Sequence, residues 1–235
     1  IIGSANVLES FRINSIPNLV YVTSDKCYLN LNKKKLYKES DPLGGLDNYS
    51  SSKASAELIF MSYFNNYFNK KKYLKVASAR AGNVIGGGDM KKNRIIPDIV
   101  RALYNNKNLK LRHPKATRPW QHVLECVGGY LLLGHKILNN DLKVKIVPNW
   151  NFGPKISNQT SVENITSMFL KNWGKNNCKI IKNTHHQFYE SKFLSLNVQK
   201  AQAELNWKPR LNLKSTINLT INWYKNYFKE KNKNI

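Results

Sequence analysis

The apolar positions at the start of the chain recur first with the spacing of a helix and then as an unbroken run. The residues at helical spacing are Ile2, Ala5, Leu8 and Phe11. This spacing predicts a helix over residues 1–14. The run Leu19–Val22 is typical of a strand buried on both faces, and it ends in the polar residues Thr23–Lys26.

A second helix and a second strand follow this first pair. Apolar residues at helical spacing after Asp47 are Ala54, Leu58 and Met61, with Phe60, Phe64 and Phe68 beside them. Val76–Ala79 predicts a strand that ends at the polar residues Arg80 and Asn83. Strand, helix and strand in this order predict a parallel crossover. Ligands bind beyond the carboxyl ends of such strands, so we expect the functional site there.

The rest of the chain alternates short helices and strands, which indicates an α/β protein. Gly86–Gly88 marks a flexible turn, which we expect to be structural because it lacks GxxGxxG spacing. We expect helices near 95–104, 124–138, 161–173 and 214–229, and strands near 109–111, 146–147 and 193–196.

Composition narrows the class of protein. With 41% hydrophobic residues and no apolar run of about eighteen residues, the sequence predicts a globular protein without a membrane partner, which we expect in the cytoplasm. Cys27, Cys126 and Cys178 lie far apart without a CxxC pair, which predicts reduced thiols. The pair His185–His186 has no third ligand at useful spacing, so we expect no metal.

A formal net charge of +24 raises the alternative of nucleic-acid binding. The lysines are scattered, with short clusters at Lys33–Lys35 and Lys70–Lys72, and they occur together with abundant Asn and Ile. This distribution indicates a compositional bias rather than a binding stripe. We therefore do not expect nucleic acid as the partner, although the charge can attract an anionic nucleotide.

The principal chemical signal is Tyr49 followed four residues later by Lys53. On a helix this spacing places both side chains on one face. A nearby ammonium favours the phenolate, so such a pair can accept a hydroxyl proton. A half-buried tyrosine beside a surface lysine is the alternative for an isolated match. The strands that end in Ser24–Lys26 and in Arg80 favour the chemical interpretation.

Several ordered motifs resemble those of the extended short-chain dehydrogenase/reductase superfamily. They are Thr23–Tyr28, Asp41–Gly45 and Tyr49–Lys53. Arg80–Asp89 and Arg118–Val123 narrow the resemblance to the CDP-glucose 4,6-dehydratases, and Asn151–Pro154 and Leu205–Pro209 extend it almost to the carboxyl end.

This resemblance implies a reaction and a cofactor. Such enzymes convert CDP-glucose to CDP-4-keto-6-deoxyglucose and water, and NAD is reduced and reoxidised within one turnover. The implied catalytic residues are Ser24, Asp25, Lys26, Tyr49 and Lys53, and the implied NAD-binding residues are Thr23, Tyr49 and Lys53.

Each implied catalytic residue has a role in the family's scheme. Tyr49 takes the proton from the hydroxyl on sugar carbon 4, Lys53 holds the nicotinamide ribose, and Ser24 hydrogen-bonds the same sugar oxygen. Asp25 matches the general acid for the departing hydroxyl. Lys26 matches the elimination base, where related dTDP-glucose dehydratases have Glu.

The resemblance also implies a substrate-binding set made of Asn83, Arg94 and Arg118. A surface salt bridge for Arg94 and a structural hydrogen bond for Asn83 are the alternatives. The region Tyr189–Ser191 matches the family's substrate loop only loosely, which leaves the specificity for the base open.

The implied fold is a truncated Rossmann-like, doubly wound parallel sheet with a smaller mixed α/β substrate-binding lobe. We assign residues 1–87 and 120–153 to the NAD-binding domain, and residues 88–119 and 154–235 to the lobe. The chain starts within a helical pattern and lacks the GxxGxxG turn. We therefore expect an amino-terminal segment to be absent, this chain alone to fold poorly and be inactive, and the full-length protein to form a homodimer.

Two other functions remain open at this point. One is another nucleotide-sugar dehydratase or epimerase of the same superfamily, against which Lys26 and the Arg118–Val123 run argue. The other is a non-catalytic basic fragment that binds sugar nucleotide or nucleic acid.

Overall fold

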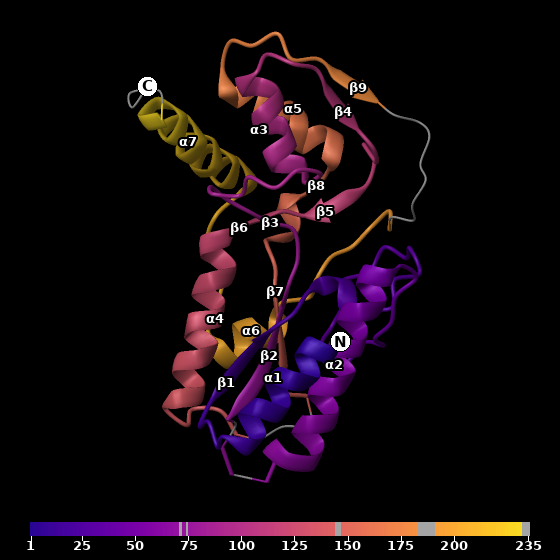
Figure 1. Ribbon diagram of the computed structural model, residues 1–235, viewed down its shortest axis with the longest axis vertical. Helices are drawn as coiled ribbons and strands as arrows, with labels where there is room; N and C mark the ends of the chain where they lie inside the picture. Colours follow the sequence, from indigo (N-terminus) through magenta and orange to yellow (C-terminus); the bar gives the residue numbers. More distant parts are fainter. Residues whose placement is uncertain (71, 74, 144–146, 183–190, 232–235) are drawn as a thin grey trace. The chain divides into compact units, whose positions relative to one another are not determined.

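A computed structural model describes residues 1–70, 72–73, 75–143, 147–182 and 191–231 (Figure 1). The chain divides into two compact units. The first comprises Ile1–Gly82, Glu125–Gly153 and Leu194–Pro209, and the second comprises Asn83–Leu124, Pro154–Phe193 and Arg210–Ile235.

The first unit is built on a parallel sheet of three strands. β1 (Leu19–Val22), β2 (Val76–Ala81) and β7 (Asn149–Phe152) lie in the order β1-β2-β7. All six residues of the central strand β2 are buried, including the polar residues Ser78 and Arg80, which alternate with alanines along the strand. The predicted parallel crossover from β1 to β2 is confirmed.

Helices cover both faces of this sheet (Figure 1). They are α1 (Ile2–Ile13), α2 (Asn48–Tyr63), which continues as a π-helical turn over Phe64–Phe68, and α4 (Val123–Leu138). Tyr21 stacks on Phe60 of α2 with ring centroids 5.5 Å apart, whereas Val20 lies against Gly134 of α4. Because neighbouring residues of a strand point to opposite faces, α2 and α4 lie on opposite sides of β1.

The segment Leu194–Pro209 packs with the first unit, although our assignment from the sequence placed it in the lobe. It contains a short helix, α6 (Gln199–Leu205), that the sequence analysis did not predict. Ala201, Leu205 and Trp207 join the apolar core of the first unit. The rings of Trp207 and Phe152 of β7 pack edge-on with their centroids 5.1 Å apart. Burial of this aromatic pair holds the segment against the sheet.

Among its described residues, the second unit contains three pairs of short strands and three helices. β3 (Val84–Ile85) is parallel to β6 (Gln121–His122), β4 (Leu109–Leu111) is parallel to β9 (Ile180–Lys182), and β5 (Thr117–Pro119) is antiparallel to β8 (Gln159–Ser161). The helices are α3 (Ile95–Tyr104), α5 (Val162–Trp173) and α7 (Leu213–Lys231), and their buried faces form one apolar core.

Two expected strands differ from the structure. The strand expected near Ile146–Val147 begins instead at Asn149, and Ile146 lies outside the described residues. Residues 193–196 form only isolated bridges at Phe193 and Leu196. Within the described residues, no helix combines the length and the apolarity needed to cross a bilayer. The three cysteines are free thiols, as predicted.

Candidate active site

The polar residues after β1 form a tight turn at the carboxyl end of the sheet. Asp25–Cys27 makes one turn of 3-10 helix, η1, and Ser24 caps it by accepting a hydrogen bond from the Lys26 backbone N–H at 3.2 Å. The Ser24 hydroxyl donates to Asp25 Oδ1 at 3.2 Å. Asp25 is only 2% exposed, so its carboxyl is held inside the first unit.

Helix α2 begins beside this turn, with Asp47 as its N-cap. Asp47 Oδ1 accepts from the Ser50 backbone N–H at 2.9 Å, and Oδ2 accepts from the Ser50 hydroxyl at 2.6 Å. Partial burial opposes the charge of Asp47, but these hydrogen bonds and the positive charge of Lys26 outweigh it and hold the pKa of Asp47 below its ordinary value. The cap of α2 therefore interacts electrostatically with η1.

Tyr49 and Lys53 come together at the start of α2. Tyr49 is 54% exposed, and Lys53 Nζ lies 5.5 Å from the centroid of its ring. Because α2 packs against η1, Ser24–Lys26 and this pair belong to one region of the first unit. An exposed phenol with an ammonium beside it and a buried carboxyl close by can act as base and acid.

The three implied substrate-binding residues belong to the second unit. Arg94 forms an exposed ion pair with Asp89 at 3.0 Å, and Arg118 is 5% exposed and donates to the Thr117 carbonyl at 2.8 Å. Asn83 has a φ of 47°, and its carbonyl accepts from the Gln121 backbone N–H at 3.3 Å. The structure thus gives Arg94 an ion pair and Asn83 a backbone hydrogen bond, and the substrate-binding role of all three residues stays a prediction.

The glycine run of the second unit is closely packed. A Cβ on Gly87 would lie 2.1 Å from the indole of Trp223, so the backbone of this turn rests on that side chain. A phosphate-binding loop needs open amide groups. Contact with Trp223 explains the need for a glycine at position 87, and the structural role of Gly86–Gly88 stays a prediction.

Part of the donor set for NAD is present. The exposed hydroxyl of Tyr49 and the partly buried ammonium of Lys53 can hydrogen-bond the hydroxyls of a ribose. Thr23, the third residue implied to bind the cofactor, directs its hydroxyl to Glu57. These residues fit the nicotinamide-ribose end of a dinucleotide.

Among the described residues, no group of three or more His, Cys, Asp or Glu side chains is arranged to hold a metal ion. His185, His186, Tyr189 and Glu190 lie outside the described residues.

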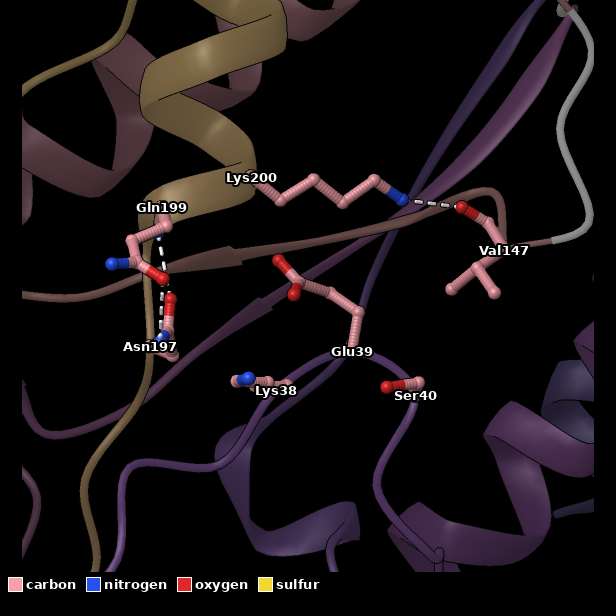
Figure 2. A pocket seen from close by; sticks show the side chains of 7 residues that line it. All are labelled: Lys38, Glu39, Ser40, Val147, Asn197, Gln199 and Lys200. Carbon is pink, nitrogen blue, oxygen red and sulfur yellow. Dashed lines mark hydrogen bonds between the residues drawn. The ribbon is translucent and has the colours of Figure 1, made fainter.

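A cavity of about 650 Å³ opens elsewhere in the first unit (Figure 2). Its lining residues are Lys38, Glu39, Ser40, Val147, Asn197, Gln199 and Lys200. The Lys200 ammonium donates to the Val147 carbonyl and, at 2.8 Å, to the Asn149 carbonyl. Burial raises the pKa of Glu39. None of the residues predicted for catalysis lines this cavity.

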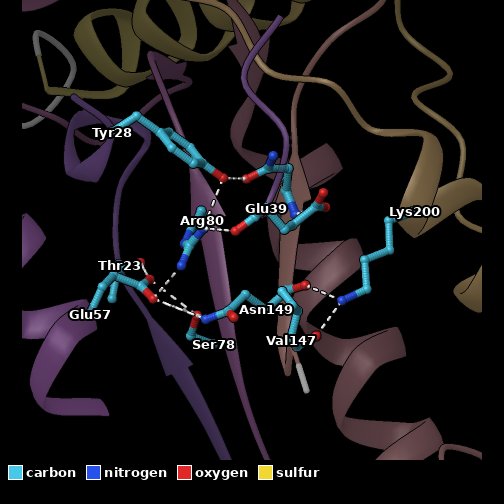
Figure 3. A network of polar contacts seen from close by, with 10 residues as sticks. Thr23, Tyr28, Glu39, Glu57, Ser78, Arg80, Val147, Asn149 and Lys200 are labelled. Carbon is cyan, nitrogen blue, oxygen red and sulfur yellow. Dashed lines mark hydrogen bonds and ion pairs between the residues drawn. The ribbon is translucent and has the colours of Figure 1, made fainter. Parts of the chain in front are cut away.

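The sequence analysis did not identify a buried polar network that joins α2 to the sheet (Figure 3). Glu57 of α2 and Arg80 of β2 form an ion pair at 2.8 Å, with both side chains almost fully buried. Glu57 lies four residues after Lys53, the same spacing that separates Lys53 from Tyr49. This repeated spacing is the signal in the sequence that could have identified Glu57, because it puts all three residues along one face of the helix.

Comparison with known proteins gives relatives over almost the whole chain. A family model described as GDP-mannose 4,6 dehydratase matches residues 1–220. CDP-glucose 4,6-dehydratase of Salmonella typhimurium is 38% identical over 230 residues, which cover 96% of this chain and 63% of that relative. The chain thus spans less than two thirds of the relative's length.

Solved structures with the same fold include two nucleotide-sugar enzymes. dTDP-glucose 4,6-dehydratase from Bacillus anthracis, in complex with NAD, has a TM-score of 0.81 and 24% identity, covering 97% of this chain and 68% of that one. UDP-glucose 4-epimerase from Thermotoga maritima, with UDP-glucose, has a TM-score of 0.81 and 18% identity, covering 97% and 70%. These similarities confirm the predicted α/β class with a Rossmann-like parallel sheet.

Proposed function

The chain belongs to the GDP-mannose 4,6 dehydratase family, and from this premise we propose that it supplies the catalytic residues of an NAD-dependent hydro-lyase, a CDP-glucose 4,6-dehydratase. The observation that carries the proposal is the juxtaposition of η1 with the start of α2, which brings a buried carboxyl into the region of the Tyr49–Lys53 pair. The 38% identity to a CDP-glucose 4,6-dehydratase supports this substrate.

In the proposed first step, Tyr49 removes the proton from the hydroxyl on sugar carbon 4. The ammonium of Lys53, 5.5 Å from the ring centroid, favours the phenolate that this step requires. Ser24 hydrogen-bonds the same sugar oxygen and fixes its position. When bound, NAD would supply a transient acceptor for the hydride that leaves carbon 4, and the hydride would later be donated to carbon 6 of the sugar. Thr23, Tyr49 and Lys53 would hold its nicotinamide-ribose end.

In the proposed second step, the ketone on carbon 4 acidifies the proton on carbon 5. Lys26 removes this proton, and Asp25 protonates the hydroxyl that leaves carbon 6 as water. When carbon 6 is reduced, Lys26 returns the proton to carbon 5. An ammonium cannot accept a proton, so this role requires Lys26 to lose its own proton before the step. Asn83, Arg94 and Arg118 of the second unit are proposed to bind the diphosphate, ribose or sugar of the substrate, and the guanidinium groups of the two arginines are suited to phosphate. The proposed roles of the two units are therefore dinucleotide binding for the first and substrate binding for the second.

The test is turnover by a polypeptide that joins this chain to an amino-terminal dinucleotide-binding segment. CDP-glucose, dTDP-glucose and UDP-glucose are supplied separately, and the 4-keto product is measured by its absorbance in alkali. We expect product from CDP-glucose alone. Product from dTDP-glucose or UDP-glucose instead would transfer the assignment to another dehydratase of the superfamily, and no product from all three would remove the dehydratase proposal.

Two substitutions separate the steps. Tyr49→Phe is expected to lower kcat by about 10²–10⁴-fold, because it removes the base of the first step. Lys26→Ala is expected to leave the first step intact, so that reduced cofactor accumulates without product. Tyr67→Phe alters another exposed tyrosine and serves as the matched control. Equal activity of Tyr49→Phe and Tyr67→Phe would contradict the proposed role of Tyr49.

We also propose that the full-length protein is a cytoplasmic homodimer whose subunits meet through α1 and α2. Large apolar side chains of these helices are exposed at Ile2, Ile13 and Leu58. Exposed apolar groups of this kind favour association when they are contiguous.

A further inference from the structure

Glu57 joins helix α2 to all three strands of the sheet (Figure 3). Its carboxylate pairs with Arg80 of β2 at 2.8 Å and accepts from Asn149 of β7 at 3.0 Å. It also accepts from the Ser78 hydroxyl at 3.0 Å and from the hydroxyl of Thr23, which directly follows β1. One buried carboxylate therefore fixes the helix to β2, to the start of β7 and to the residue that follows β1.

Arg80 extends the connection to the segment after η1. Its Nη1 donates to the Tyr28 hydroxyl at 2.9 Å and to the Glu39 carbonyl at 3.0 Å. The Tyr28 hydroxyl in turn donates to Asn151 Oδ1 at 2.7 Å. Tyr28 follows η1 directly, so the same guanidinium restrains the segment that carries Asp25 and Lys26.

The spacing along α2 connects this anchor to the reactive pair. Glu57 lies four residues after Lys53 and eight after Tyr49, about 6 Å and 12 Å along the helix axis. Residues at this spacing share one face of a helix. Anchoring Glu57 therefore sets the rotation and the height at which Tyr49 and Lys53 face η1.

Stability alone is a weak explanation for this ion pair. Removing two charges from water costs free energy that their attraction often only offsets, and apolar residues of similar volume can be equally stabilising. A buried carboxylate with donors from three strands is, however, well suited to defining one position of a helix. We propose that Glu57 and Arg80 are positioning residues that hold Tyr49 and Lys53 against Ser24–Lys26.

This inference rests on the proposed function, so the parent polypeptide with its dinucleotide-binding segment is assayed first. Failure of the parent to convert any sugar nucleotide contradicts the proposed function itself. With an active parent, the informative variant is Glu57→Asp, which keeps the charge and withdraws the carboxylate by one methylene. Glu9→Asp makes the same change in the exposed Glu9–Arg12 ion pair of α1 and is the matched control.

We expect Glu57→Asp to fold and to bind CDP-glucose with KM within about threefold of the parent, while kcat per binding site falls by about 10²-fold, the size of effect that misplacement by about 1 Å can cause. Titration with CDP counts the folded binding sites, so kcat is expressed per folded molecule. A purely structural role of Glu57 would lower the number of sites and leave kcat per site unchanged. Glu9→Asp should leave kcat and KM unchanged. An unchanged kcat per site for Glu57→Asp, or its failure to fold, would overturn the positioning role.

Discussion

At the scale of single residues, Gly82 is required by the position of Asp25. A Cβ on Gly82 would lie 1.7 Å from Asp25 Oδ2 and 2.1 Å from its Cγ. The carboxyl thus occupies the space that any other side chain at position 82 would fill. Since Asp25 is only 2% exposed, it has little room to move aside. The absence of a side chain at Gly82 therefore leaves the space that the carboxyl of the proposed general acid occupies.

The prediction is that Gly82→Ala displaces Asp25 and impairs elimination. We expect turnover of CDP-glucose to fall by about 10²-fold and the free energy of unfolding to fall by about 1–3 kcal/mol from overpacking. Steady-state kinetics and denaturant unfolding measure the two effects. Gly128→Ala on α4 is the control, because a Cβ there meets no atom within 4 Å. That substitution should keep full activity, and equal activity of both variants would contradict the steric argument.

At the scale of elements, α2 carries both the proposed base and the residue proposed to position it. Its first turn bears Tyr49, and its buried face bears Glu57. The cap at Asp47 fixes where the helix begins, because its carboxylate accepts both hydrogen bonds from Ser50. The cap thus lies two residues before the proposed base, and the helix itself begins one residue before that base.

Loss of this cap should destabilise the protein in a way that depends on pH. Asp47→Ala is expected to cost about 1 kcal/mol of unfolding free energy at pH 7. The pKa of Asp47 is lowered in the folded state, so the contribution of its charge is present above the unfolded pKa and is lost as pH falls through the folded value. Denaturant unfolding at several pH values, from neutral into the acid range, measures both effects.

Asp47→Asn is the matched control for the charge, since its amide oxygen can still accept from Ser50. Its difference from the parent should shrink as the acid range is entered, because the parent's carboxylate becomes protonated there. A difference that stays constant with pH would show that the charge of Asp47 contributes nothing to stability.

The sequence predicts α2 and its neighbouring strands because their patterns are local. The run Leu19–Val22 and the apolar spacing after Asp47 are visible within a few residues. The burial of Glu57 is not local, because Arg80 and Asn149, which make it favourable, come from strands distant in the sequence. Similarly, α6 is a short helix whose packing depends on Phe152 and Trp207. Its sequence is too short to show a helical spacing of apolar residues.

At the scale of the whole molecule, unit 1 exposes two sets of large apolar side chains. One is the α1–α2 set of Ile2, Ile13 and Leu58, and the other is the α4 set of Val127, Leu131 and Leu138. Helix α4 also buries apolar residues on its opposite side at Cys126, Leu133 and Ile137, so it is apolar on most of its circumference. Such helices are usually covered in the assembled protein. Either set could therefore mediate association.

The two sets can be distinguished by one charge placed in each. Leu58→Glu adds a carboxylate to the α1–α2 set, and Leu131→Glu adds the same group to the α4 set; the parent residues are 57% and 70% exposed. A carboxylate in a desolvated interface is strongly unfavourable, whereas on a solvated surface it costs little. For the full-length protein we therefore expect light scattering to report a monomer for Leu58→Glu and a dimer for Leu131→Glu. The reverse result would move the subunit interface to α4, and dimers in both cases would remove both sets from it.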